Sequence, residues 1–279
     1  MIGRMGVCSW SLGPESPEAL TESLARVGAS GCQLALDPIR TGSWSLERTK
    51  RVMADAGLVI LSGMMATVGE DYSTLETIRR TGGVRPDEHW QENQQAASDD
   101  ARIAAELGIE LVTFHAGFLP HDAADPERVV LIDRLREIAD IYSAAGVCIG
   151  FETGQETAST LLSVLASIDR AEVGVNFDPA NMILYGMGDP GQAIVALGSQ
   201  IAQAHVKDAL PSPEAGQWGR EVVAGTGAVD WSVYFATLAR MDRSVDLLVE
   251  REAGDTRERD IATALGLIEA YLGKEVTRG

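Results

Sequence analysis

Four apolar runs of strand length in the second half of the chain carry, at or near their ends, a side chain that can bind a metal ion. These side chains are Glu152 in VCIGFE, Asp178 in VGVNFD, His205 in IAQAHV and Glu250 in VDLLVE. Alternate side chains of a strand point to opposite faces, and the first three share their faces with small or polar neighbours. We expect all four to converge at one end of a set of parallel strands.

Three carboxylates gathered in a half-buried site repel one another, and their pKa values rise unless a cation neutralises them. One divalent metal ion resolves this, and three oxygen donors with one imidazole favour Mn²⁺, with Mg²⁺ or Co²⁺ as alternatives, over a thiolate-rich zinc site. Asn176 and Gln203, one step deeper on the same faces, are expected to orient the ligands. Taken singly, Asp178 before Pro179 has the form of a helix cap and His205 that of a structural histidine, so the prediction depends on the set.

The elements that must position these residues are short apolar runs that alternate with longer amphipathic segments. This alternation indicates parallel strands with helical crossovers. Eight such units in 279 residues predict an α/β fold, a single (β/α)8 TIM barrel domain over residues 1–279, for which roughly 250 residues is typical. The alternative is an open doubly wound sheet, but SWSLGPES follows the first strand in place of a glycine-rich phosphate loop. The expected strands are Met5–Trp10, Cys32–Leu36, Leu58–Met64, Ile109–His115, Val147–Glu152, Val173–Asp178, Ile201–Val206 and Val245–Glu250.

Three of the intervening helices have clear start and stop signals. Each has a capping side chain, then proline at the first helical position, and glycine at the exit. The three are Ser16-Pro17 to Gly28, Asp125-Pro126 to Gly146 and Asp189-Pro190 to Gly198. Two connections after strands are long, from Ala66 to Trp90 and from Lys207 to Gly227, and in a barrel both rise from the face that carries the active site.

The charge and composition exclude some classes of function. A formal charge of -18 disfavours a phosphate-binding surface, so nucleic acid is not an expected partner. No run of 18 apolar residues and no signal peptide is visible, which predicts a soluble, cytoplasmic protein without a membrane partner. Cys8, Cys32 and Cys148 each lie in an apolar run and are expected to be reduced, buried thiols.

From GVCSW to its end, the chain resembles the xylose isomerase-like barrel superfamily, in particular the sugar phosphate isomerase/epimerase group. That group includes ketose 3-epimerases, hydroxypyruvate isomerase and inosose dehydratase. The motifs that carry the resemblance are FETGQETA, VNFDPANM, AHVKDA, GTGAVDW and LVEREAGD. The resemblance implies one metal held by Glu152, Asp178, His205 and Glu250, with Glu152 and Glu250 as the acid and base. It also implies a small carbohydrate substrate and a homodimer or homotetramer.

The chain departs from the epimerase pattern at two positions. Asn181 stands where ketose epimerases usually have a histidine, and Lys207 where they have a glycine. Lys207 can bind an anionic oxygen, act as an acid in a lyase, or pair with Asp208 or a site carboxylate. Glu252 is the rival of Glu250 as the last ligand, and Glu250 is preferred because it ends the apolar run. Further candidates for substrate binding are Trp10 at the mouth of the first strand, His115 on the fourth, Gln155 and Glu156 at the rim, and Arg220 in the seventh loop.

The expected function is therefore a metal-dependent isomerase or epimerase of a small keto-sugar or related polyol. The enediolate formed by proton removal beside a carbonyl is the intermediate that a base and a Lewis acid can support. A dehydratase or lyase that expels a leaving group from the same enediolate is the alternative. An apurinic endonuclease of the same superfamily would need several more histidines and a basic groove, and a non-catalytic sugar-binding barrel is the remaining class.

Overall fold

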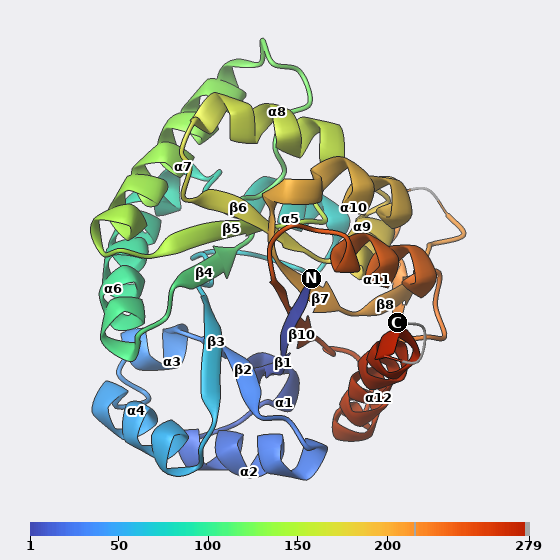
Figure 1. The fold of residues 1–279 in the computed structure, drawn as a ribbon. Helices are drawn as coiled ribbons and strands as arrows, with labels where there is room; N and C mark the ends of the chain where they lie inside the picture. Colours follow the sequence, from blue (N-terminus) through green and yellow to red (C-terminus); the bar gives the residue numbers. More distant parts are fainter. Residues whose placement is uncertain (215, 277–279) are drawn as a thin grey trace.

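The protein is a closed barrel of eight parallel strands surrounded by helices, as the sequence predicted (Figure 1). A computed structural model describes residues 1–214 and 216–276. Around the barrel the strands follow the order β1-β10-β7-β6-β5-β4-β3-β2, so the last strand pairs with the first and leaves no open edge. The barrel strands are β1 Ile2–Cys8, β2 Gly31–Ala35, β3 Val59–Met64, β4 Leu111–Phe114, β5 Cys148–Glu152, β6 Val173–Phe177, β7 Ile201–Val206 and β10 Val245–Val249.

The helices begin where the capping signals place them. Ser16, Asp125 and Asp189 each accept a hydrogen bond from a first-turn backbone N–H, and proline follows each of them. Helix α12 packs beside α2, so the last helix completes the outer ring next to one of the first. The helices are α1 Ser9–Leu12, α2 Pro17–Val27, α3 Asp37–Arg40, α4 Leu46–Asp55, α5 Leu75–Thr81, α6 Trp90–Leu107, α7 Pro126–Ala144, α8 Ala158–Ile168, α9 Pro179–Tyr185, α10 Pro190–Leu197, α11 Trp231–Ala239 and α12 Arg257–Val276, with 3₁₀ turns η1 Asp87–His89 and η2 Gly198–Gln200.

Some predicted boundaries and one predicted burial are wrong. The first strand ends at Cys8, and Trp10 belongs to the short helix α1, where SWSL makes a single turn that ends at a left-handed Gly13. Cys148 is exposed, because it is the first residue of β5, at the end of the barrel opposite the candidate site. The two long connections contain structure of their own: α5 and η1 in the first, and the antiparallel hairpin of β8 Asp208–Leu210 and β9 Arg220–Val222 in the second.

The core has two parts of different chemistry. Bulky side chains such as Phe151 and Phe177 face the helices and belong to the large apolar layer between strands and helices. Inside the barrel, a small apolar cluster of Cys8, Leu61 and Leu248 gives way to buried polar residues towards the carboxyl ends of the strands. Burying polar groups is unfavourable unless they are paired, so a cluster of them at this end of the barrel indicates a binding or catalytic site.

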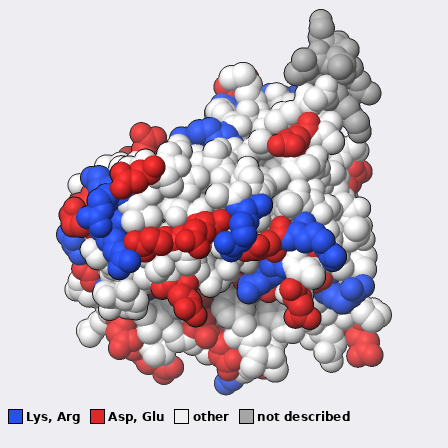
Figure 2. All heavy atoms as spheres, turned by 90° about the horizontal axis from the view of Figure 1, so that it is seen from below, with Lys and Arg blue, Asp and Glu red and all other residues white. Residues whose placement is uncertain are grey.

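On the face drawn in Figure 2, basic side chains are interleaved with acidic ones. A nucleic-acid surface needs clustered positive charge, and this face does not offer it. No helix in the described part of the chain is long and apolar enough to cross a membrane.

Candidate metal centre

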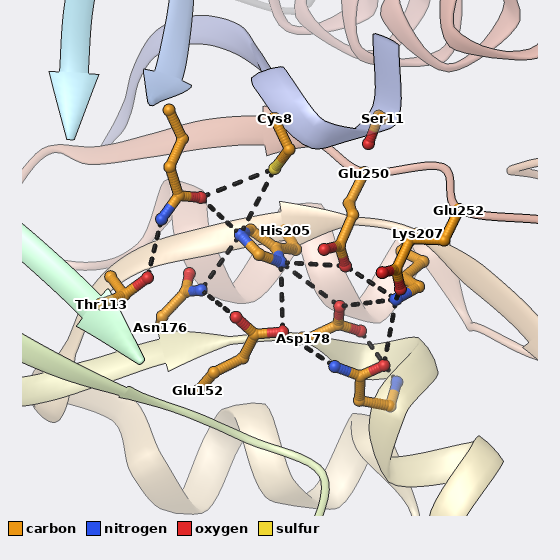
Figure 3. A network of polar contacts seen from close by, with 12 residues as sticks. Cys8, Ser11, Thr113, Glu152, Asn176, Asp178, His205, Lys207, Glu250 and Glu252 are labelled. Carbon is orange, nitrogen blue, oxygen red and sulfur yellow. Dashed lines mark hydrogen bonds and ion pairs between the residues drawn. The ribbon is translucent and has the colours of Figure 1, made fainter. Parts of the chain in front are cut away.

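The four strand-end residues meet at the carboxyl end of the barrel (Figure 3). Glu152 is the last residue of β5, Asp178 and Glu250 each follow directly after a strand, and His205 is near the end of β7. Because neighbouring parallel strands end at the same rim, residues far apart in sequence become neighbours here. All four are buried; Glu250, with 5% of its surface exposed, is the most open.

The imidazole of His205 lies at the centre of the carboxylates. Its Nδ1 is 3.3 Å from Asp178 Oδ2, 3.4 Å from Glu250 Oε2 and 3.7 Å from Glu152 Oε1. One ligand atom from each residue lies within 4.8 Å of all the others. Three oxygens and one nitrogen at this spacing can be bridged by one divalent ion.

Hydrogen bonds behind His205 define which nitrogen faces the carboxylates. Gln33 Oε1 lies 2.8 Å from Nε2 and also accepts from Gln203 Nε2, while the Gln33 amide nitrogen donates to Thr113 Oγ1 at 2.7 Å. Gln33 Oε1 can only accept, and it lies closer to Nε2 than the Asn176 amide nitrogen at 3.0 Å does, so we assign a hydrogen to Nε2; Nδ1 is then the nitrogen that faces the carboxylates and that a metal ion would bind. A metal-binding histidine is usually held in this way. Gln33 was missed in the sequence, although it is a polar residue inside the apolar run Cys32–Leu36.

The two glutamates have pKa values shifted in opposite directions. Burial raises the pKa of Glu152 to about 7, against the opposing effect of His115 and His205. Burial also acts to raise the pKa of Glu250, but Lys207 and His205 outweigh it and hold that pKa well below its ordinary value. These shifts describe the cluster without a metal ion, and they show that the two carboxyl groups lie in different electrostatic surroundings.

The donor set fits a divalent ion. Burial lowers the pKa of His205, but the surrounding anionic groups hold it well above the ordinary value, so the imidazole is a cation when no metal ion is present. A bound metal ion would replace this proton as the positive charge among the carboxylates. A second possible set, Cys8 with His205 and Glu250, fits less well because burial raises the pKa of the Cys8 thiol to about 12.

Asp178 also explains the cap-like appearance of its sequence. Its Oδ1 accepts from the backbone N–H of Asn181 at 2.8 Å and so caps α9, while Oδ2 faces His205. Capping and metal binding therefore use different oxygens of one carboxylate.

Glu250 is held by two donors. Trp10 Nε1 donates to Oε1 at 2.7 Å, and Lys207 Nζ donates to Oε2 at 2.8 Å. Lys207 also donates to Glu252 Oε2 at 2.6 Å, and so it pairs with the site carboxylates, not with Asp208. Glu252 lies outside the four-residue cluster, and its side chain is 55% exposed.

A cavity of about 470 Å³ opens beside the cluster. His115 and Asn181 line it, and both lie against Glu152: His115 Nε2 is 3.5 Å from Glu152 Oε1, and Asn181 Nδ2 donates to the same oxygen at 2.8 Å. Its apolar wall consists of Trp10, Met64, Met65, Leu184, Tyr185 and Trp218. The long 66–90 connection supplies Glu70 and Tyr72, and α3 supplies Asp37, none of which the sequence patterns had singled out.

Three candidates for substrate binding lie away from this cavity. Gln155 and Glu156 are buried, not at the rim, and the Gln155 amide nitrogen donates to the Tyr185 hydroxyl of α9 at 3.3 Å. Arg220 is exposed on β9 and is absent from the lining of the cavity. In the same strand, Glu221 turns inward and accepts from Arg251 Nη1 at 2.7 Å, so the alternation of the hairpin takes Arg220 outward.

The protein is thus a parallel barrel with three buried carboxylates and one histidine at the carboxyl ends of its strands, and these four side chains can hold one divalent metal ion. Residues 21–271 match the family model of the xylose isomerase-like TIM barrel, and the chain belongs to this family. The resemblance found in the sequence is thereby confirmed.

Solved structures of several proteins are similar to this chain. A xylose isomerase domain protein from Planctomyces limnophilus is 28% identical, with a TM-score of 0.85 over 92% of this chain and 93% of its own. An L-ribulose 3-epimerase (18% identical, TM-score 0.73, 99% and 96% covered) shares the fold. The probable 3-DHS dehydratase AsbF from Bacillus anthracis also shares the fold: it is 16% identical, with a TM-score of 0.73 over 96% of this chain and 99% of its own. No curated protein matches the chain.

Proposed function

We propose that the protein is a divalent-metal-dependent isomerase or epimerase of a small keto-sugar or related polyol. The observation that supports this most is the convergence of Glu152, Asp178, His205 and Glu250, with two glutamates of opposed pKa beside one cavity. A proton on the carbon beside a carbonyl is weakly acidic, so its removal needs a positioned base and stabilisation of the enediolate that forms. Mn²⁺ is the ion we favour, with Mg²⁺ or Co²⁺ as alternatives.

Each glutamate has its own role in the proposal. When bound, a divalent ion would polarise the carbonyl oxygen of the substrate as a Lewis acid. Glu250 remains ionised and accepts the proton from carbon, held in place by Trp10 Nε1 and Lys207 Nζ. Glu152 returns a proton to the enediolate; without a metal ion its pKa is raised to about 7 by burial. Asn181 fixes Glu152, and His115 lies beside it to contact substrate.

The alternative, a dehydratase or lyase, also starts with this proton transfer but needs an acid for the leaving group. Lys207 is poorly suited to that role. Burial acts to lower its pKa, but the carboxylates of Glu250, Glu252 and Asp178 outweigh burial and hold the pKa well above its ordinary value. A proton held this firmly is not readily given to a leaving group.

The test is incubation of the Mn²⁺-loaded protein with D-fructose, D-tagatose and L-ribulose in deuterium oxide, followed by NMR and mass spectrometry. Deuterium uptake with an isomeric product supports the proposal, whereas loss of water from the substrate supports the alternative. Glu152→Gln and Glu250→Gln should each lower the rate by about 10²–10⁴-fold. Glu269→Gln, at an exposed position on α12, is the matched control and should leave the rate unchanged.

The proposal includes a cytoplasmic location and a homodimer or homotetramer. Light scattering on the purified protein tests the second of these: a monomer at micromolar concentration contradicts it.

A further inference from the structure

The cavity beside the candidate metal centre is acidic. Four carboxylates, Asp37, Glu70, Glu250 and Glu252, are among its lining residues, and no lysine or arginine is among those that the structure describes there. A divalent ion would add two positive charges, but it would be shared with Glu152 and Asp178 as well as Glu250. The negative charge of the site therefore persists with the ion bound.

Lys207, the cation beside the cluster, has no free donor for an anionic ligand. Its three N–H groups match three acceptors: Glu250 Oε2 at 2.8 Å, Glu252 Oε2 at 2.6 Å and Asn181 Oδ1 at 3.2 Å. Its side chain is 2% exposed. A phosphate would have to break these ion pairs and leave two carboxylates unpaired.

Asp37 on α3 lines the cavity and can accept a hydrogen bond from a hydroxyl group of the substrate. Arg40 Nη2 donates to its Oδ1 from behind and also reaches the Ala66 carbonyl oxygen at 3.3 Å. Arg40 Nε faces the fully buried Asp100, whose Oδ1 lies 3.6 Å away. Arg40 is thus engaged by two carboxylates, while the Asp37 side chain keeps 30% of its surface exposed at the cavity.

On the basis of the proposed function, we propose that the cavity takes an uncharged polyhydroxylated substrate and excludes phosphorylated or carboxylated ones, with Asp37 as a specificity-determining residue. Ionised carboxylates accept hydrogen bonds from hydroxyl groups, and these bonds are stronger than those between neutral groups. An anionic substrate offers acceptors where the cavity also has acceptors, and its charge is repelled by the carboxylates that line the cavity.

Calorimetric titration of the Mn²⁺-loaded protein tests this with two matched sets of probes. The neutral set is D-fructose, D-tagatose and L-ribulose, and the anionic set is D-fructose 6-phosphate and L-ribulose 5-phosphate. We expect the neutral sugars to bind at least about tenfold more tightly than the phosphate esters, with a smaller difference in 1 M salt, where the Debye length is about 3 Å. Asp37→Asn should lower the affinity for the neutral sugars by about tenfold, and it should reduce the difference in affinity between the neutral and the phosphorylated sugars.

Asp55→Asn, at an exposed position on α4, is the matched control and should change neither affinity. Phosphate esters that bind as tightly as the free sugars, or binding by neither set, would overturn the inference. The wild-type comparison alone decides this if Asp37→Asn fails to fold. Neutral sugars that bind but take up no deuterium would refute the proposed isomerase and leave the inference on substrate charge intact.

Discussion

Glu156 follows β5 by four residues and is buried with one carboxyl oxygen unpaired. Only 3% of its surface is exposed, and Oε1 has no hydrogen-bond partner within the described residues. Burial, with a smaller effect from Glu152, raises the pKa of Glu156 from 4.5 to about 8. We predict that Glu156→Gln, which keeps the shape and removes the charge, stabilises the protein at alkaline pH.

The size and sign of this effect follow from the two pKa values. Below pH 4.5 the carboxyl group is protonated in both the folded and the unfolded chain, so its ionisation does not change the free energy of unfolding. Between pH 4.5 and about 8 the unfolded chain releases the proton while the folded chain keeps it, so stability falls as the pH rises. At about 1.36 kcal/mol for each pH unit, the full cost reaches up to roughly 5 kcal/mol above pH 8.

The assay is urea unfolding followed by circular dichroism at pH 5 and pH 9, with a chelator to hold the metal state constant. Glu156→Gln should match the wild type within about 1 kcal/mol at pH 5 and exceed it by several kcal/mol at pH 9. The exposed Glu269→Gln control should change stability by less than about 0.5 kcal/mol at both values. Equal or lower stability of Glu156→Gln at pH 9 would refute the reasoning, because the carboxylate would then be well solvated or paired.

Three further predictions concern the metal centre. Asp178→Asn keeps a capping side chain for α9 but removes the charge, so the melting temperature should change little while Mn²⁺ affinity, measured by calorimetry, falls at least about 100-fold; unchanged affinity would exclude Asp178 as a ligand. Gln33→Leu removes the acceptor for His205 Nε2 and should lower Mn²⁺ affinity by about 10–100-fold, and an effect below twofold would contradict the assigned tautomer. Trp10→Phe keeps the ring but loses the donor to Glu250, so steady-state kinetics should show kcat about tenfold lower with KM little changed; a rise in KM alone would make Trp10 a substrate contact only.

The sequence was most informative where one short-range rule decides the outcome. Side-chain alternation in β5 and β6 put Phe151 and Phe177 towards the helices and Glu152 towards the axis, because burial on both faces leaves little freedom in register. Capping residues such as Ser16 marked the helix starts for a similar reason. The role of Gln33 could also have been predicted, because it is a polar residue in an otherwise apolar strand and its side chain points into the barrel.

The residues that could not be placed depend on contacts between distant segments. Glu156 is buried although it lies in the connection between β5 and α8, where a charged residue is ordinarily expected to be exposed. Arg220 and Glu221 differ by one position in a hairpin whose register the sequence does not show, so the outward direction of Arg220 could not be read from the sequence. Asp37 lines the cavity at the start of α3, where Arg40 of the same helix pairs with it, and Arg40 in turn faces Asp100 on the distant helix α6.

The most direct test of the account is anomalous X-ray scattering from crystals of the protein grown with Mn²⁺. We predict one strong peak per chain, within bonding distance of Glu152, Asp178, His205 Nδ1 and Glu250, and its loss in the Asp178→Asn variant. A protein saturated with Mn²⁺ that shows no peak at this position, or a peak bound by other residues, would contradict the central claim.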